Sequence, residues 1–395
     1  SVWLCIQWSS TMFEGVVMVG RSWRRCVLTA TFVLLCFYVL ATDDPPTSPT
    51  PPTDNGIQGV SSAPSSLWDS QYNLPVLEKA LDAAQDPQVQ RVLRIHKNHV
   101  KVPESTPNVK VVLASTWRSG STFLGEILAS YPGVFYHYEP LTPYGLQQIG
   151  PGPIQEEVHS LLKEILDCNY QNLEEYLNIA FSNQDMFVRN AQLWSMCIGM
   201  PRSKCFIPSN LEVLCSVFPV HVMKIVRARL AVIAPLLNDP QVQLLWLVRD
   251  PRAIMNSRTT NVKWCNKQVC SSAASLCSDM MADYQTFTNL KKYHKNIKVV
   301  YYEDLAQNTF NKTQEILDFV GLSFHSNIKK YLEDHLTLEK DEPWSTHHNP
   351  NSRVGHWKKV MSYDAVIKIQ FHCQGVMKAL GYQPIMSQRE LIKNY

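Results

Sequence analysis

Residues suited to binding an anion follow an expected strand between Asn108 and Tyr131. Val109 to Ala114 is a short apolar run typical of a buried strand, and Thr122 to Tyr131 has apolar residues at helical spacing. The first amides of such a helix lack partners within it, and its dipole favours negative charge. We therefore predict a phosphate- or sulfate-binding loop at the turn, with an ordinary strand-to-helix corner as the alternative. The residues predicted to bind are Trp117, Arg118, Ser119, Gly120, Ser121, Thr122 and Phe123.

A second pair of residues suited to a phosphate is Arg249 and Ser257. An expected strand from Gln243 to Val248 ends at Arg249, and Pro251 suits the first turn of a following helix. A guanidinium at the end of a strand and a hydroxyl on the next helix can converge on one phosphate. The alternative is a capped helix start with an internal ion pair.

Other classes of anion-binding protein fit the sequence less well. Ser121 stands where a Walker A loop has its lysine, and no acidic magnesium motif is evident. A nucleotide-dependent kinase on a related fold is therefore the disfavoured alternative, and no metal is predicted. The formal net charge of +3 is small for 395 residues, so no nucleic-acid partner is expected.

Strand and helix patterns alternate along most of the chain. Further strands are expected at 134–138, 221–226, 243–248 and 297–302, and helical patterns separate several of them. This predicts an α/β fold with a parallel sheet flanked by helices, whose ligands gather at the carboxyl ends of the strands. We expect the strand at 134–138 to lie beside the first. We also expect the irregular, cysteine-bearing stretch 151–215 to be a helical insertion that shapes an acceptor cleft.

The N-terminal part of the chain has the pattern of a membrane anchor and a stem. Arg21, Arg24 and Arg25 precede an uncharged run, which predicts a cytoplasmic tail at 1–25 and a single-pass type II anchor at 26–41. A cleaved signal peptide is the alternative. A stem rich in proline, serine and threonine is predicted at 42–107, a luminal domain at 108–385 and a C-terminal tail at 386–395. Helical spacing at 74–92 leaves open a stem helix or a cap of the domain.

Eight cysteines fall on the predicted luminal side of the anchor: Cys168, Cys197, Cys205, Cys215, Cys265, Cys270, Cys277 and Cys373. An even number in an oxidising compartment predicts disulfides, with the connectivity open. Zinc is the alternative, but no CxxC pair occurs. Asn311, in the sequence Asn-Lys-Thr, is the predicted glycosylation site.

Taken together, the two anion motifs make the chain resemble the Golgi carbohydrate sulfotransferases, and most of all their galactose/N-acetylglucosamine 6-O branch. The resemblance covers about 110–385 and includes the stretches 135–140, 223–227, 302–305 and 352–358. It implies a P-loop-like sulfotransferase fold on a Golgi membrane anchor, with the catalytic domain luminal. It also implies transfer of a sulfuryl group from 3′-phosphoadenosine 5′-phosphosulfate (PAPS), without a metal, to the 6-hydroxyl of galactose or N-acetylglucosamine in a glycan or glycoprotein.

The resemblance also implies which residues contact the donor. Residues 117–123 match the 5′-phosphosulfate loop, Arg249 and Ser257 match the 3′-phosphate motif, and Arg353 and Gly355 match a loop that closes over the nucleotide. The segments 152–215 and 261–277 have no clear counterpart in the family. Acceptor choice is expected to lie in these two segments.

The chemistry of sulfuryl transfer assigns roles to further residues. Arg118 and the amides around Gly120 are expected to stabilise the departing phosphate, and Glu139 to act as general base with a pKa raised by partial burial. His137 is the alternative base, since strand alternation puts it on the same face as Glu139. Lys224 and Arg227 are expected to bind phosphosulfate or an anionic glycan, with surface salt bridges as the alternative. A catalytically silent Golgi glycan-binding protein is the remaining alternative.

Overall fold

The computed structural model describes residues 74–99, 102–183, 185–262, 264–265, 268–337 and 350–393. All of them belong to the unit formed by residues 66–395. Within these ranges no helix is long and apolar enough to cross a membrane. The predicted cytoplasmic tail at 1–25, the anchor at 26–41 and the first part of the predicted stem lie outside the described residues.

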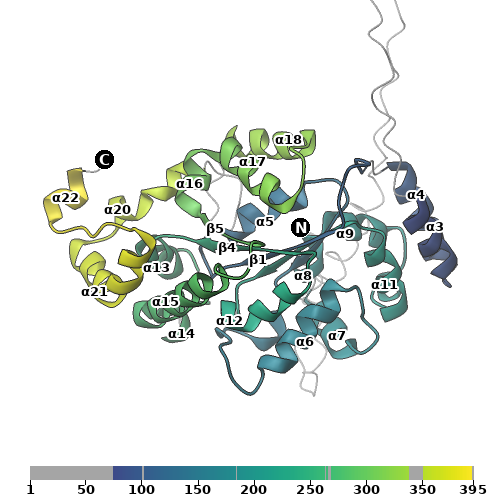
Figure 1. The fold of residues 1–395 in the computed structure, drawn as a ribbon, viewed down its shortest axis with the longest axis horizontal. Helices are drawn as coiled ribbons and strands as arrows, with labels where there is room; N and C mark the ends of the chain where they lie inside the picture. The colour runs from purple at the N-terminus through teal and green to yellow at the C-terminus, as the bar shows by residue number, and fades with distance from the viewer. Residues whose placement is uncertain are drawn as a thin grey trace, which may run out of the picture. The chain divides into compact units, whose positions relative to one another are not determined.

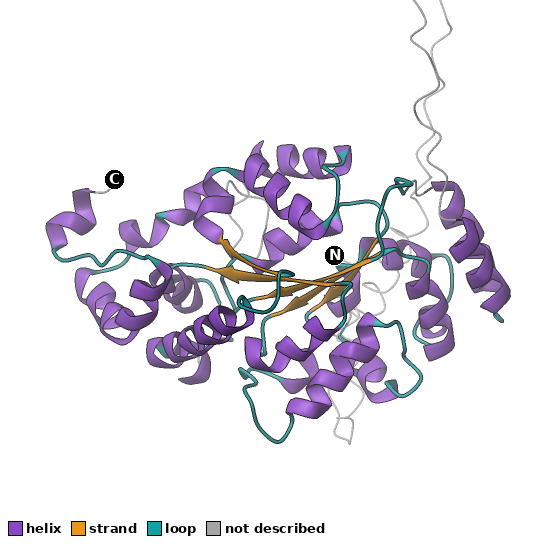
Figure 2. Cartoon of the chain, viewed as in Figure 1, coloured by secondary structure: helices purple, strands orange, loops and turns teal. Residues whose placement is uncertain are grey.

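A parallel sheet of five strands forms the centre of the domain (Figures 1 and 2). The strands are β1 (Val109–Ala114), β2 (Val134–Tyr138), β3 (Val220–Ile225), β4 (Val242–Val248) and β5 (Ile297–Tyr301). Their positions agree with the sequence pattern to within about one residue, and all four neighbouring pairs are parallel. The predicted α/β fold with a parallel sheet is confirmed.

The strand order is β2-β3-β1-β4-β5, which differs from the sequence-based expectation in one respect. We expected β2 to lie beside β1, but β3 lies between them, because Val220 pairs with both Val109 and Val134. All six residues of β3 are buried, as expected of an inner strand. In chain order, β2 and β3 are therefore added on one side of β1, and β4 and β5 are then added on its other side. Such a reversal is where open α/β sheets bind their ligands.

Helices cover both faces of the sheet (Figure 1). Val111 and Leu113 of β1 belong to one core cluster, together with residues of α5 (Ser121–Ala129), α17 (Thr309–Val320) and α18 (Ser326–Thr337). Val112 and Ala114 belong to a second cluster, with residues of α6 (Gln155–Leu166), α12 (Leu230–Ile233), α15 (Ala273–Leu290) and α21 (Tyr363–Leu380). Alternate residues of one strand thus supply two separate cores.

The long connection between β2 and β3 is helical, as predicted for 151–215. After α6 it contains α7 (Glu174–Ser182), α8 (Asp185–Val188), α9 (Ala191–Ile198), α10 (Arg202–Cys205) and α11 (Pro208–Ser216). The disulfides Cys168–Cys215 and Cys197–Cys205 lie within or at the edge of this insertion. Cys265–Cys270 and Cys277–Cys373 account for the other predicted luminal cysteines. The prediction of disulfides is confirmed, and zinc ligation by these cysteines is wrong.

Two helices precede the sheet, α3 (Leu74–Ala83) and α4 (Pro87–His99). Both pack against α11, and Leu77 and Leu93 are fully buried in the same core cluster as the insertion helices. The sequence left open whether this stretch is a stem helix or a cap of the domain, and the structure shows a cap. The remaining elements are η1 (Thr142–Tyr144), η2 (Ala234–Asn238), α13 (Pro251–Thr260), α14 (Gln268–Ser271), α16 (Tyr302–Gln307), α19 (Pro350–Val354), α20 (His356–Val360) and α22 (Gln388–Lys393).

Candidate active site

A cavity of about 920 Å³ lies at the carboxyl ends of the strands. Four residues that directly follow strands or lie within a few residues of their ends line it: Arg118, Glu139, Arg227 and Arg249. The structure therefore brings the four residues together, as the parallel arrangement predicts.

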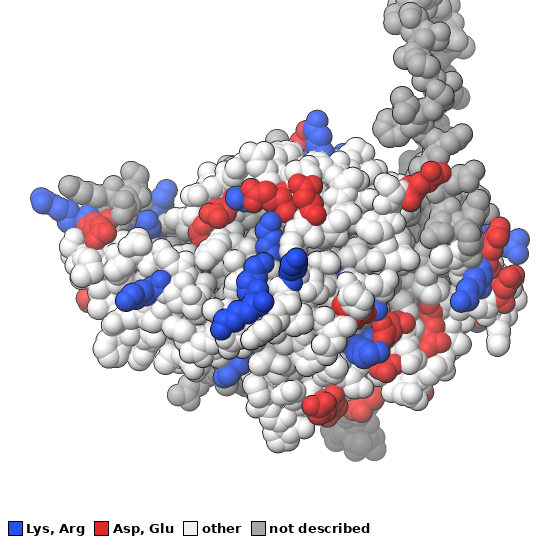
Figure 3. Space-filling model, viewed as in Figure 1, with Lys and Arg blue, Asp and Glu red and all other residues white. Residues whose placement is uncertain are grey.

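The cavity is strongly cationic, although the chain as a whole is nearly neutral. Among the described residues that line it, Glu139 is the one carboxylate. On the face shown in Figure 3, basic and acidic side chains form small separate groups, so no broad basic surface extends over that face. The positive charge of the cavity comes from six lysine and arginine side chains, namely Arg118, Arg189, Lys224, Arg227, Arg249 and Arg353.

The loop at 117–123 forms one wall of the cavity. Gly120 has a φ of 94° and caps the N-terminus of α5. A Cβ atom at this position would lie 2.3 Å from the Tyr302 ring, so both the backbone conformation and the space require glycine. The start of α5 therefore presents its first amides at the cavity wall.

Ser119 is the one residue of the predicted loop that the cavity wall does not include. It is completely buried, and its hydroxyl contacts Ser115 and donates to the Thr116 carbonyl oxygen at 2.7 Å. Ser115 in turn donates to the Leu247 carbonyl of β4 at 2.7 Å. Ser119 thus stabilises the loop from within. Its side chain does not face the cavity, where the sequence analysis had expected it to contact a ligand.

Arg118 connects the loop to the second motif. Its Nε atom donates to Ser257 Oγ on α13 at 3.0 Å. Its φ of 70° lies in the left-handed region, and so does the φ of 47° at Glu139. Such conformations cost energy in residues other than glycine, and they occur most often at functional sites.

Arg249 ties together three segments that are far apart in sequence. It donates to the carbonyl oxygens of Arg118 at 3.1 Å and of Arg353 at 3.0 Å, and its guanidinium lies 4.2 Å from the centre of the Tyr302 ring. Its buried Nε atom has no hydrogen-bond partner among the described residues. Burial and then the neighbouring Arg249 lower the pKa of Arg118. The cluster therefore concentrates positive charge in a form that suits a bound anion.

The helix that follows Arg249 begins as the sequence predicts. Pro251 is in the first turn of α13, and the Asp250 side chain accepts from the Arg252 amide at 2.8 Å as the N-cap. Asp250 also forms a buried ion pair with the Arg252 side chain. The alternative of a capped helix start is thus correct for these two residues, while Arg249 and Ser257 face the cavity.

The C-terminal segment contributes Arg353 from α19 to the cavity wall, together with Pro350, His356 and Trp357. Gly355, which was predicted to contact the nucleotide, is the N-cap of α20 and is not among the lining residues. Arg353 and His356, close to it on either side in the chain, line the cavity, and a Cβ atom at Gly355 would have no atom within 4 Å.

Glu139 forms a buried group of ion pairs with the two residues expected to bind an anionic ligand. Lys224 Nζ lies 2.6 Å from Glu139 Oε1 and 3.1 Å from Thr122 Oγ1. Arg227 pairs with the other carboxylate oxygen and donates through Nε to the Gly145 carbonyl at 2.9 Å. The salt bridges of the alternative interpretation do form, but they are buried and not at the surface, since the Lys224 side chain is only 2% exposed.

The predicted raised pKa of Glu139 is wrong. Burial by itself raises the pKa of this carboxyl group, but the positive charges of Lys224 and Arg227 outweigh burial and lower the pKa to about 2. The reason is the strand order: β2 pairs with β3, and Tyr138 lies opposite Lys224 in that pair. Glu139 is therefore a carboxylate at every physiological pH.

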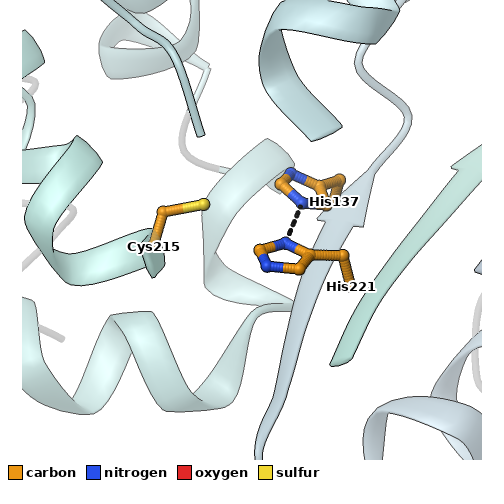
Figure 4. A group of neighbouring side chains, drawn as sticks. All are labelled: His137, Cys215 and His221. Atoms are coloured by element: carbon orange, nitrogen blue, oxygen red, sulfur yellow. Dashed lines mark hydrogen bonds between the residues drawn. The ribbon is translucent and has the colours of Figure 1, made fainter. Parts of the chain in front are cut away.

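His137, the alternative base, is not among the residues that line the cavity, and it lies beside His221 in the core (Figure 4). Its Nε2 atom is 3.1 Å from Nδ1 of His221, and the two rings stack in the core. Burial and then His221 lower the pKa of His137 well below its usual value. Cys215 is close by, but its sulfur is bonded to Cys168. His137 and Glu139 do not share a face, because β2 ends at Tyr138 and the left-handed Glu139 breaks the alternation.

Several lining residues carried no recognisable signal in the sequence. Arg189 comes from the insertion, forms an ion pair with Glu126 and lies 4.9 Å from the centre of the Tyr138 ring. Its position depends on helix packing, which a single sequence does not reveal. Trp264 belongs to the segment 261–277, which lies within the residues that match the family model, and the sequence analysis did not single it out. Asn311 is exposed on α17, as expected of a glycosylation site.

The sequence of this domain matches a known family of transferases. Residues 111–326, more than half of the chain, match the family model described as "Sulfotransferase family". The chain therefore belongs to the sulfotransferase family and is a sulfotransferase.

The similar curated proteins are carbohydrate sulfotransferases, in agreement with the family predicted from the sequence. Carbohydrate sulfotransferase 1 of Mus musculus is 28% identical over 340 residues, which cover 71% of this chain and 81% of that protein. Carbohydrate sulfotransferase 5 of Homo sapiens is 26% identical over 337 residues, covering 72% and 80%. Among solved structures, the sulfotransferase domain of the Synechococcus PCC 7002 olefin synthase has a TM-score of 0.40 at 16% identity, and the match covers 73% of this chain and 100% of that chain.

Proposed function

We propose that this protein transfers a sulfuryl group from PAPS to the 6-hydroxyl of N-acetylglucosamine or galactose in a glycan or glycoprotein. The observation that carries the proposal is the buried arginine cluster at the cavity, in which Arg249 Nε has no partner among the described residues. A polar hydrogen buried without a partner is costly, and a phosphate oxygen would accept from it. The names of the curated relatives support a carbohydrate acceptor.

The donor has two anionic ends, and the cavity has a group of residues for each. Arg118 and the first amides of α5 would hold the 5′-phosphosulfate. Arg249 and Ser257 would hold the 3′-phosphate, with Arg353 closing the site from the C-terminal segment. No step of this assignment requires a metal, because the positive charge comes from side chains and amides.

Glu139 would accept the proton of the attacking hydroxyl. The new bond forms between the acceptor oxygen and sulfur, the bond between sulfur and the phosphate oxygen breaks, and the proton moves to a Glu139 oxygen. Arg118 and the loop amides stabilise the charge that develops on the leaving phosphate. A carboxylate with a pKa of about 2 is a weak base. We therefore infer that it accepts the proton late, when bonding to sulfur has already made the hydroxyl acidic.

Lys224 supports this inference by its position between the base and the donor loop. Its Nζ atom contacts both Glu139 Oε1 and Thr122 Oγ1. A phosphosulfate bound at the loop would compete with Glu139 for this ammonium group. Such competition would weaken the ion pair and raise the basicity of Glu139 when the donor is present.

The proposed location is the Golgi membrane, with the catalytic domain in the lumen. The support is the arginine-flanked apolar run at 26–41, together with four disulfides in the described domain, which indicate an oxidising compartment.

The test is incubation of the purified domain with 35S-labelled PAPS and a mixed pool of glycans in the presence of EDTA. We expect label in glycans that end in, or contain, N-acetylglucosamine or galactose, and mass spectrometry should place the sulfate on the 6-oxygen. Binding of PAP without any transfer would indicate a silent glycan-binding protein. Transfer of phosphate from labelled ATP would indicate a kinase. Either result would refute the proposal.

A further inference from the structure

Two of the tryptophans that line the cavity are in contact with each other, and the donor assignment accounts for only one of them, Trp117. Trp117 and Trp264 both line the cavity, and their ring centres are 6.3 Å apart in an edge-to-face arrangement. Trp117 is almost completely buried, at 5% exposure, whereas Trp264 is only partly buried. The more accessible ring is therefore Trp264.

Trp264 is linked to the base through Trp117 and Arg227. The Arg227 guanidinium, which pairs with Glu139, is 5.9 Å from the centre of the Trp117 ring, and Trp264 packs against the same ring. The phosphate-binding cluster contacts a different aromatic residue, because Arg249 lies over Tyr302. Arg249 is thus associated with Tyr302, whereas Arg227, which pairs with Glu139, is associated with the Trp117–Trp264 pair.

The position of Trp264 is fixed by covalent and polar contacts. The adjacent Cys265 is bonded to Cys270, and both cysteines are buried in a small cluster against which Trp264 packs. Arg258, only 2% exposed, donates to the Cys270 carbonyl at 3.1 Å and to the Trp117 carbonyl at 3.2 Å. One buried guanidinium therefore joins the disulfide loop to the loop that would hold the phosphosulfate.

We propose that Trp264, held by the Cys265–Cys270 disulfide and by Arg258, is the platform on which the ring of the acceptor sugar rests. This inference depends on the sulfotransferase function proposed above and names a specificity determinant for it. A pyranose ring has apolar C–H faces and polar edges. An indole ring can cover one such face while Glu139 and the donor loop engage the hydroxyl at the edge.

The arrangement also explains why a disulfide encloses such a short segment. The loop leaves α13 only a few residues after Ser257, so the same piece of chain serves the donor and the proposed acceptor platform. Cross-linking limits the conformations of the partly buried indole before the acceptor binds. Arg258 acts here as a positioning residue, since it contacts backbone carbonyls of both loops.

The test compares Trp264→Ala and Trp264→Phe in steady-state transfer to the acceptor that wild type labels best, with PAP affinity measured by calorimetry. Trp264→Ala should raise the acceptor KM by about tenfold, while Trp264→Phe keeps most of the affinity. The PAP affinity of both variants should stay within about twofold of wild type. The matched control is Trp194→Ala, which removes another partly buried tryptophan that lies outside the cavity lining.

A second pair of variants tests the role of the cross-link independently. Replacing both Cys265 and Cys270 by serine should raise the acceptor KM in the same direction, whereas replacing Cys197 and Cys205, which close another short loop outside the cavity lining, should not. Thermal melting of each variant shows that it is folded.

Three outcomes have different meanings. An unchanged acceptor KM in folded Trp264→Ala overturns the platform. A loss of PAP affinity equal to the rise in acceptor KM also overturns it, because Trp264 would then contact the donor. Failure of wild type itself to sulfate any glycan, with PAP binding intact, refutes the proposed function instead.

Discussion

The replacement of Glu139 by glutamine tests the catalytic assignment most directly. Glutamine is nearly isosteric with glutamate but is not a base, so turnover should fall by roughly 10²–10⁴-fold. The affinity for PAP should be retained, because the residues assigned to the donor lie on other segments. In wild type, activity that needs ionised Glu139 is lost only as the pH falls through about 2. The rate should therefore show no acid limb from Glu139 between pH 9 and 5.

The structure also sets the cost of this replacement in stability. The pKa of Glu139 falls from 4.5 to about 2, which corresponds to about 3 kcal/mol of favourable interaction at about 1.36 kcal/mol per pKa unit. Because the folded pKa is depressed, this stability is present above about pH 4.5 and is lost as the pH falls through about 2. Glutamine leaves Lys224 as a buried cation without its carboxylate, so the variant should lose roughly 3–5 kcal/mol.

Two further variants separate catalysis from stability. The double variant with Glu139→Gln and Lys224→Met removes the buried charge with its partner, so it should regain stability without regaining turnover. Lys224→Met alone should raise the pKa of Glu139 and move an acid limb of the rate into the range above about pH 3. Asp279→Asn, which breaks an ion pair with Arg229 outside the cavity lining, is the control for a simple loss of charge.

The assay is single-turnover transfer of 35S to a glycan acceptor across the pH range, with PAP calorimetry and urea unfolding on the same samples. The reasoning fails if folded Glu139→Gln keeps turnover within about threefold of wild type. It also fails if the double variant recovers both stability and activity. Loss of turnover in His137→Gln with Glu139→Gln active would transfer the role of base to the histidine.

The other predictions concern the donor, the topology and the pH dependence of stability. Arg118→Ala and Arg249→Ala should each weaken PAP binding by roughly 1.5–3 kcal/mol in calorimetry, because each loses a charge-assisted contact to phosphate. In cell-expressed protein, Asn311→Gln should run faster on a gel than wild type, and endoglycosidase should remove the difference. Burial raises the pKa of Asp283 from 3.8 to about 7, with Asp279 adding to the rise, while the hydrogen bond from the Leu230 amide and the charge of Arg229 act in the opposite direction. Folding therefore favours the protonated form of Asp283, and this contribution to stability is complete below about pH 3.8 and is lost as the pH rises through about 7. Asparagine cannot ionise, so Asp283→Asn should be more stable than wild type at pH 8.5 by roughly 1–4 kcal/mol in urea unfolding.

Each of these predictions has an outcome that contradicts it. Wild-type PAP affinity in both arginine variants would mean that the assigned donor site is wrong, and Arg202→Ala, which lies outside the cavity lining, controls for removal of an arginine. Identical mobility of the Asn311 variant and wild type, with no effect of endoglycosidase, would remove the support for a luminal position. If the difference in unfolding free energy between Asp283→Asn and wild type is the same at pH 5 and at pH 8.5, burial does not perturb the pKa of this carboxyl group.

Local signals in the sequence were sufficient for the strands and for the loops after them that line the cavity. Short apolar runs followed by Arg118 or Arg249 predicted both the strands and the residues at their carboxyl ends, because side chains near a strand end in a parallel sheet necessarily share one edge. Gly120 was recognisable for a similar reason, since only glycine fits its conformation beside Tyr302. An even count of luminal cysteines predicted disulfides, although not their partners.

Contacts between segments far apart in the chain were decided only by the tertiary structure. The charge state of Glu139 depends on Lys224 and Arg227, which reach it because β3, rather than β1, pairs with β2. Strand order results from how both faces of the sheet are packed, and the sequence of a single strand does not contain it. The contact between Trp264 and Trp117 likewise depends on tertiary structure, namely on the Cys265–Cys270 disulfide and on the buried Arg258. Local patterns in the sequence identified several residues of this site individually. The ion pairs of Glu139 and the contact between Trp117 and Trp264 arise from packing, which no local pattern encodes.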